Sequence, residues 1–136
     1  MFSLKHIKKL YKHAKDMGFS FPDEVQGKSL AWMRRHYNGI GAEWLPRWVR
    51  KMTTFFLSPL EPAALLHDVE YLGKNKSYWR FTVANFRLFL NAAKDKYFFL
   101  GLGAALVCQL FGWSAWKEGK ETMCYYYYYE EECNDK

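Results

Sequence analysis

The sequence predicts an all-α fold, and three observations carry this prediction. Apolar residues recur at spacings of three and four, strand-like alternation is scarce, and glycine and proline stand where helices would begin or end. The 136 residues suffice for one domain with a single modest core. We expect this domain to cover residues 1–120, followed by a low-complexity tail of tyrosine and glutamate over residues 121–136.

The first predicted helix is basic and amphipathic, and it ends at Gly18. Lysines and two histidines fill one face. The apolar face consists of Leu4, Ile7, Leu10, Tyr11, Ala14 and Met17. Two interpretations are open: the helix packs on the core with its lysines in solvent, or it lies on anionic lipid as an interfacial helix.

The next segment is irregular and rich in turn signals. Residues 18–30 are predicted as a loop in which Pro22 opens a short helix, and residues 31–36 continue as helix. Residues 37–43 form a second loop with two glycines one residue apart, which can turn carbonyls or amides toward a ligand. Residues 44–60 mix tryptophan and phenylalanine with cations, which suits a lipid head-group boundary or a protein interface equally.

Two helices follow that we expect to pack antiparallel. The first begins near Glu61, has Pro62 in its first turn, where a missing N–H does no harm, and ends at Gly73. The second covers residues 78–94. One face of this second helix consists of Phe81, Ala84, Asn85, Leu88 and Ala92.

Residues 97–116 contain no charged side chain. Their length, with lysines on both sides and tryptophan or tyrosine at the edges, meets the requirement for a membrane span. Glycines, Gln109 and Ser114 dilute the hydrophobicity of the segment. We therefore expect a buried, apolar C-terminal helix of the domain and keep the membrane span as the alternative.

Composition favours a partner with negative charge and an apolar surface. The formal net charge is +6, half of the residues are hydrophobic and 20% are aromatic, which exceeds what one small core buries. Phospholipid is the expected partner and nucleic acid is not, because the aromatic residues do not follow a strand pattern. Three cysteines do not describe a disulfide scaffold, and we expect no secretory signal, so a cytoplasmic or peripheral membrane location is predicted.

The adjacent pair His67 and Asp68 is the candidate for chemistry. Neighbouring helix residues point about 100° apart, so the two side chains must address different partners. A cation on Asp68 and a water beside His67 would satisfy that geometry, and Tyr71 lies close enough along the helix to support either side chain. A helix with one polar residue at the edge of the core is the alternative interpretation.

Three ordered motifs within residues 37–90 extend this candidate. The glycine loop Tyr37-x-Gly39-x-Gly41 precedes the run from Ala64 to Tyr71 that contains His67-Asp68, and Ala84-Asn85-x-x-x-Phe89 follows. Together the motifs resemble the phospholipase A2 superfamily, most of all its small viral and phage forms.

The resemblance implies a calcium-dependent hydrolase of phospholipid esters. Asp68 would bind Ca²⁺ together with main-chain oxygens of Gly39, Gly41 and Glu43, since calcium requires hard oxygen ligands. His67 would be the general base that deprotonates the attacking water, with Tyr71 and Asn85 completing the site.

Two departures from the family pattern support a second hypothesis. The family usually has an aspartate where this chain has Asn85, and the stretch between Gly41 and His67 is longer than in the compact secreted enzymes. An amide oxygen accepts the imidazole N–H but does not stabilise its positive charge. The alternative is a non-catalytic phage structural or membrane-associated protein that keeps the fold, with a second copy or a virion component as partner.

Overall fold

The computed structural model describes residues 2–37 and 55–118, and every regular element in these two ranges is a helix. The predicted all-α class is therefore confirmed. In chain order the elements are α1 (Leu4–Asp16), η1 (Asp23–Val25), α2 (Leu30–His36), η2 (Ser58–Leu60), α4 (Glu61–Tyr71), α5 (Tyr78–Lys94), α6 (Phe98–Phe111) and α7 (Trp113–Glu118).

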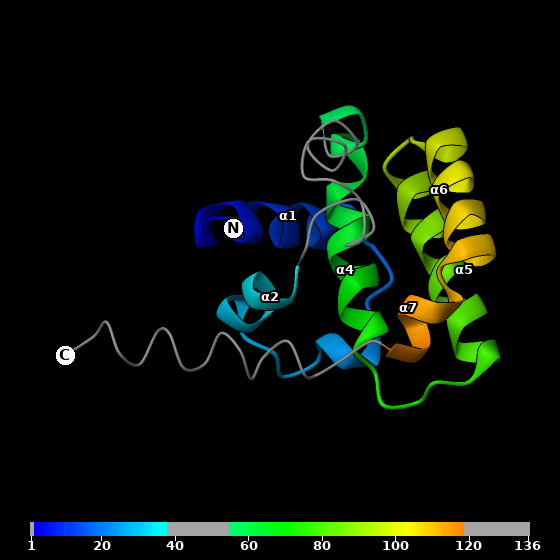
Figure 1. Cartoon of the computed structure of the whole chain (residues 1–136). Helices are drawn as coiled ribbons and strands as arrows, with labels where there is room; N and C mark the ends of the chain where they lie inside the picture. Colours follow the sequence, from blue (N-terminus) through cyan, green and yellow to red (C-terminus); the bar gives the residue numbers. More distant parts are fainter. Residues whose placement is uncertain (1, 38–54, 119–136) are drawn as a thin grey trace.

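Helix α4 lies at the centre of the fold. Figure 1 shows it between α1 and α2 on one side and the α5–α6 pair on the other. Its side chains Leu65, Leu66 and Val69 are at most 1% exposed. Pro62 occupies the first turn, as predicted from the sequence. The other helices thus pack around an element that has almost no solvent-facing side.

Helix α1 packs its apolar face into the same core. The hydroxyl of Ser3 caps the helix by accepting a hydrogen bond from the His6 N–H at 3.1 Å, and Gly18 follows the helix with a φ of +63°. The five lysines of the opposite face are exposed. The buried side chains are Ile7, Leu10 and Ala14. Because the core already covers the apolar face, the structure supports the interpretation of α1 as a core-packed helix.

Two histidine–carboxylate contacts fix α1 against the rest of the domain. His6 Nε2 lies 2.6 Å from Glu61 Oε2 at the start of α4. His13 Nε2 lies 2.8 Å from Asp95 Oδ2, directly after α5. Both contacts join residues more than 50 positions apart, so α1 bridges the beginning of α4 and the end of α5.

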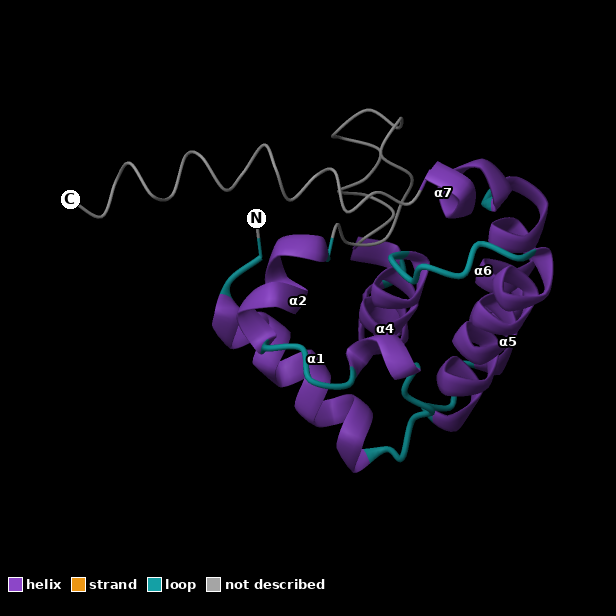
Figure 2. Ribbon diagram, turned by 90° about the horizontal axis from the view of Figure 1, so that it is seen from below, coloured by secondary structure: helices purple, strands orange, loops and turns teal. Residues whose placement is uncertain are grey.

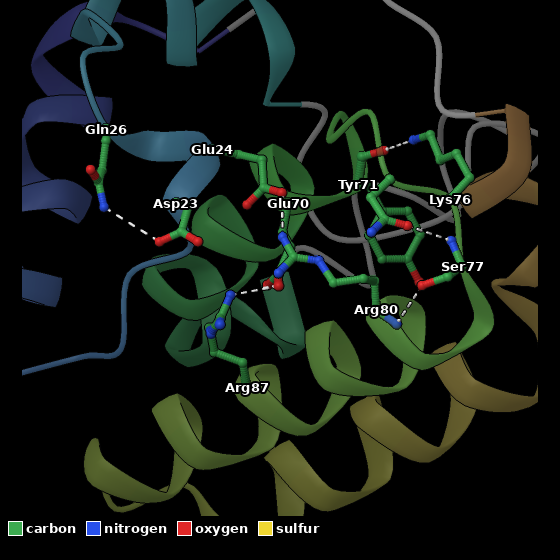
Figure 3. A network of polar contacts seen from close by, with 10 residues as sticks. Asp23, Glu24, Gln26, Glu70, Tyr71, Lys76, Ser77, Arg80 and Arg87 are labelled. Atoms are coloured by element: carbon green, nitrogen blue, oxygen red, sulfur yellow. Dashed lines mark hydrogen bonds and ion pairs between the residues drawn. The ribbon is translucent and has the colours of Figure 1, made fainter.

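A polar network joins α4, α5 and η1 (Figure 3). Glu70 on α4 is 1% exposed, and its Oε1 accepts a hydrogen bond from Arg87 on α5 at 2.5 Å. Arg80, in the first turn of α5, donates to Glu24 of η1 at 2.8 Å. Burial raises the pKa of Glu70, and the Arg87 guanidinium opposes that shift. The Glu70–Arg87 pair thus joins α5 to α4, and the Arg80–Glu24 pair joins α5 to η1.

Helices α5 and α6 form a closely packed antiparallel pair (Figures 1 and 2). The contact uses small residues: a Cβ added to Gly101 would collide with Ala92 of α5. Gly101 and Ala105 are the buried residues of α6. The absence of a side chain at position 101 therefore allows the two backbones to approach.

The expectation of one buried helix over residues 97–116 is wrong in two respects. Gly112 separates α6 from α7, so the uncharged segment forms two helices. Most of α6 is also solvent-exposed, with Leu110 at 73%. Among the residues that the structure describes, no helix is both long and apolar enough to span a membrane.

We predict opposite effects for alanine at two glycines of α6. Gly101→Ala forces α5 and α6 apart, and this overpacking lowers the free energy of unfolding by about 1–3 kcal/mol. Gly103→Ala is the matched control, because its new Cβ meets nothing within 4 Å and alanine favours the helix by about 1 kcal/mol. Urea unfolding measures both. Equal stability of the two variants would contradict the close packing at Gly101.

Candidate functional site

The candidate site is built around a buried hydrogen bond between α4 and α5. His67 Nε2 lies 2.9 Å from Asn85 Oδ1, and the two residues are only 8% and 2% exposed. Because α4 and α5 run in opposite directions after a short connection, residues 18 positions apart meet face to face. The structure thus brings together two of the residues that the sequence placed in the site.

Further hydrogen bonds fix the orientation of the Asn85 amide. Its Nδ2 donates to Gln109 Oε1 of α6 at 2.8 Å, and Gln109 Nε2 donates to Tyr78 Oη at 3.0 Å and Thr82 Oγ1 at 3.2 Å. In this arrangement the Asn85 oxygen is the atom that faces His67. An oxygen can only accept here, so Nε2 of the imidazole carries the proton and Nδ1 keeps a lone pair.

Gln109 is a site residue that the sequence analysis did not identify. In the sequence, Gln109 was noted only because it lowers the hydrophobicity of residues 97–116. A buried polar side chain needs a partner, and an isolated glutamine in an otherwise uncharged helix was the available signal. Its partner on α5 depends on tertiary packing and so was not visible in the sequence.

Tyr71 covers the site from the C-terminal end of α4. Its hydroxyl donates to Asn85 Oδ1 at 3.3 Å, and its ring centroid lies 4.5 Å from that of His67. The ring also meets Trp116 edge-on at 5.0 Å. A Cβ at Gly112 would lie 2.7 Å from the Tyr71 hydroxyl, so only glycine fits there without displacing the phenol. The predicted support from Tyr71 is therefore directed to Asn85.

Burial governs the protonation of His67. Removal from water lowers the pKa of His67 to about 4, and the hydrogen bond to Asn85 opposes this shift only in part. A neutral amide gives the imidazolium no compensating charge. His67 is therefore a neutral imidazole at pH 7, with an unprotonated Nδ1.

Asp68 points in a different direction from His67, and Tyr71 is near both residues. Burial and the charge of Asp68 together raise the pKa of Cys108 on α6 to about 11. The same charge adds to the effect of burial in raising the pKa of Tyr37 and of Tyr71. The half-buried carboxylate therefore lies on the side of α4 that faces the end of α2 and helix α6.

Only one of the predicted calcium ligands lies among the residues that the structure describes. Asp68 offers a partly exposed carboxylate, which is the ligand type that calcium prefers. Gly39, Gly41 and Glu43 lie outside the described residues. Within residues 2–37 and 55–118, no group of three or more histidine, cysteine, aspartate or glutamate side chains is placed to hold a metal ion. The described residues thus fit calcium at one position of the expected set.

Comparison with protein-family models, with curated proteins and with solved structures finds no match for this chain. The phospholipase A2 resemblance therefore rests on the motifs of the sequence. The geometry of His67, Asn85 and Gln109 stands independently of that resemblance, because it follows from the packing of α4, α5 and α6.

We predict a loss of stability in acid that depends on His67. Its pKa of about 4 in the folded state lies below the ordinary value of 6.5, so between these values the unfolded chain binds a proton that the folded chain does not. The free energy of unfolding contributed by His67 therefore falls as the pH drops from 6.5 to 4, by about 3 kcal/mol at about 1.4 kcal/mol per pKa unit.

Denaturant unfolding of the wild type and of His67→Gln across this range measures the effect. Glutamine keeps an N–H donor for Asn85 and does not titrate, so the wild type should lose more stability than the variant. Parallel pH profiles for the two proteins would contradict the neutral, buried state of His67.

Proposed function

We propose that the protein is a calcium-dependent phospholipase A2-like hydrolase that acts on ester bonds of membrane phospholipids. The observation that carries this proposal is the hydrogen bond from His67 Nε2 to Asn85, which leaves Nδ1 as a base one residue from the Asp68 carboxylate. The proposed setting is a phospholipid surface, with the protein cytoplasmic, peripheral to a membrane or part of a virion.

In the proposed reaction, His67 Nδ1 removes a proton from a water molecule as the water oxygen attacks the carbonyl carbon of the sn-2 ester. Asn85 holds the imidazole ring through Nε2, and Gln109 holds Asn85. When the carbon–oxygen bond to the glycerol breaks, the protonated Nδ1 returns its proton to the leaving alkoxide. The products are a free fatty acid and a lysophospholipid.

Calcium, held by Asp68 together with main-chain oxygens of Gly39, Gly41 and Glu43, would supply the positive charge that stabilises the oxyanion. Proton removal from the water by His67 then requires that its imidazole be neutral. That condition is met at pH 7, because burial lowers the pKa of His67.

The proposed enzyme is expected to be slow. A pKa of about 4 makes His67 a weak base. Asparagine in place of aspartate behind a catalytic histidine also removes charge stabilisation. In the serine-protease triad the same change lowers the rate by about 10⁴, largely because the histidine adopts the wrong tautomer. The same two observations favour the second candidate function, a non-catalytic phage structural or membrane-associated protein that retains a phospholipase A2-like fold.

Fatty-acid release from mixed anionic liposomes tests the proposal. We expect release by the wild type with calcium, loss of release with a chelator, and at least a 100-fold loss in His67→Gln. His13→Gln is the matched control, because His13 lies on α1 and contacts Asp95 away from the site. Circular dichroism verifies that both variants fold. Undiminished release by His67→Gln would refute the assigned base, and no release by the wild type would favour the non-catalytic candidate.

A second prediction concerns Asn85→Asp. A carboxylate stabilises the imidazolium, so the pKa of His67 should rise above about 4 and calcium-dependent hydrolysis should increase at least tenfold. Gln109 can rotate its amide and donate to the new carboxylate. Nuclear magnetic resonance titration of the imidazole and the liposome assay measure the two effects. A raised pKa without any gain in hydrolysis would mean that His67 is not a catalytic base.

A further inference from the structure

Helices α5 and α6 expose matching apolar stripes. The exposed apolar residues of α5 include Trp79, Phe86 and Leu90, and those of α6 include Phe99, Leu106 and Leu110. Both stripes have spacings of seven and four residues, which place their members on one side of each helix. We call these six residues the α5–α6 face.

The face is continuous across the two helices. Ring contacts run from Phe86 to Phe89 at 6.0 Å, from Phe89 to Phe98 at 5.0 Å and from Phe98 to Phe99 at 5.3 Å. Phe86, Phe99 and Trp79 expose 58–85% of their surface. At roughly 200 Å² per aromatic side chain these three alone present about 400 Å². With the leucines added, the patch reaches the size that marks an interaction site on a monomer.

The face points away from the candidate site. Phe86 lies two positions from both Ala84 and Leu88, which are buried, and two positions correspond to a rotation of about 200° on a helix. Leu88 belongs to the core cluster that contains α4 residues. The α5–α6 face is therefore on the side of the pair opposite α4, and nothing in the described fold covers it.

Three exposed lysines lie in the stretch of chain that carries the face. Within residues 78–117 the sequence has one acidic side chain, Asp95, and that carboxylate contacts His13 of α1. Lys96 and Lys117 are exposed just outside the two ends of the apolar run. Arg80 and Arg87 are paired with Glu24 and Glu70, so the cations of this stretch that remain for a partner are Lys94, Lys96 and Lys117. An apolar middle with cationic ends is the pattern of helices that lie in the interface of an anionic membrane.

We propose that the α5–α6 face docks the protein onto an anionic lipid surface, with α5 and α6 lying in the plane of the interface. Charge favours lipid over a second copy of this chain, because a two-fold dimer would bring the same cationic ends together without acidic partners. The docking proposal concerns a lipid contact on the side of the molecule opposite the candidate site and goes beyond the proposed function. It does not depend on catalysis by His67.

Vesicle co-sedimentation in a calcium chelator tests the docking face. We expect wild-type protein to bind vesicles of equal parts phosphatidylglycerol and phosphatidylcholine, and to bind pure phosphatidylcholine at least tenfold more weakly. The double variant Phe99→Gln, Leu110→Gln should bind the anionic vesicles at least tenfold more weakly. Both positions are exposed and glutamine is a good helix former, so the fold should persist, as circular dichroism would verify.

The matched control is Phe55→Gln, Phe56→Gln, which removes two equally exposed phenylalanines outside the face and should leave vesicle binding unchanged. His67→Gln should also bind as the wild type does, which separates docking from hydrolysis. Equal binding by the face variant and the wild type would overturn the proposal. So would light scattering that shows a dimer converted to a monomer by the face substitutions, because a second copy would then occupy the face.

Discussion

The enclosure of α4 is the constraint on which the site depends. The helix has neighbours on both sides, so polar side chains on it are taken out of water and must be bonded inside the protein. Glu70 Oε1 and His67 Nε2 meet this requirement through Arg87 and Asn85, both on α5, whereas Glu70 Oε2 is buried without a hydrogen bond. These two bonds align α5 against α4, and α6 then joins through Gln109.

The same enclosure determines what chemistry the site can perform. Burial favours the neutral imidazole, and an amide partner orients the ring without adding the negative charge that would restore its basicity. The arrangement thus supplies a well-positioned but weak base. Asp68 is half-buried on another side of α4, and a carboxylate is the ligand type that calcium prefers. On the far side of α5 and α6 the molecule has the opposite character, apolar with cationic ends.

Local signals made much of the fold predictable. The range 78–94 for α5 agrees with the structure, because Ser77 caps the helix and the apolar period identifies its buried face. Gly18 after α1 and Pro62 in the first turn of α4 were also local signals. The antiparallel meeting of His67 and Asn85 followed from a short connection between two helices.

The features that could not be predicted from the sequence depend on tertiary packing. Helix α6 is apolar on nearly every side, so its sequence has no polar face to show which side the protein leaves exposed. The exposure of Phe99 and Leu110 therefore could not be predicted from the sequence. The hydrogen bond between Gln109 and Asn85 could not be predicted either. The calcium loop expected at Gly39 and Gly41 lies outside the described residues, so it stays a prediction.

The central claim is that His67 is a neutral imidazole protonated on Nε2 and free to act as a base through Nδ1. Long-range ¹H–¹⁵N correlation spectra of the histidine rings at pH 7 test it directly, with His67 assigned by its absence from His67→Gln. The account predicts the Nε2–H tautomer for His67, persisting until the pH approaches about 4. An imidazolium at pH 7, or a neutral ring protonated on Nδ1, would contradict it.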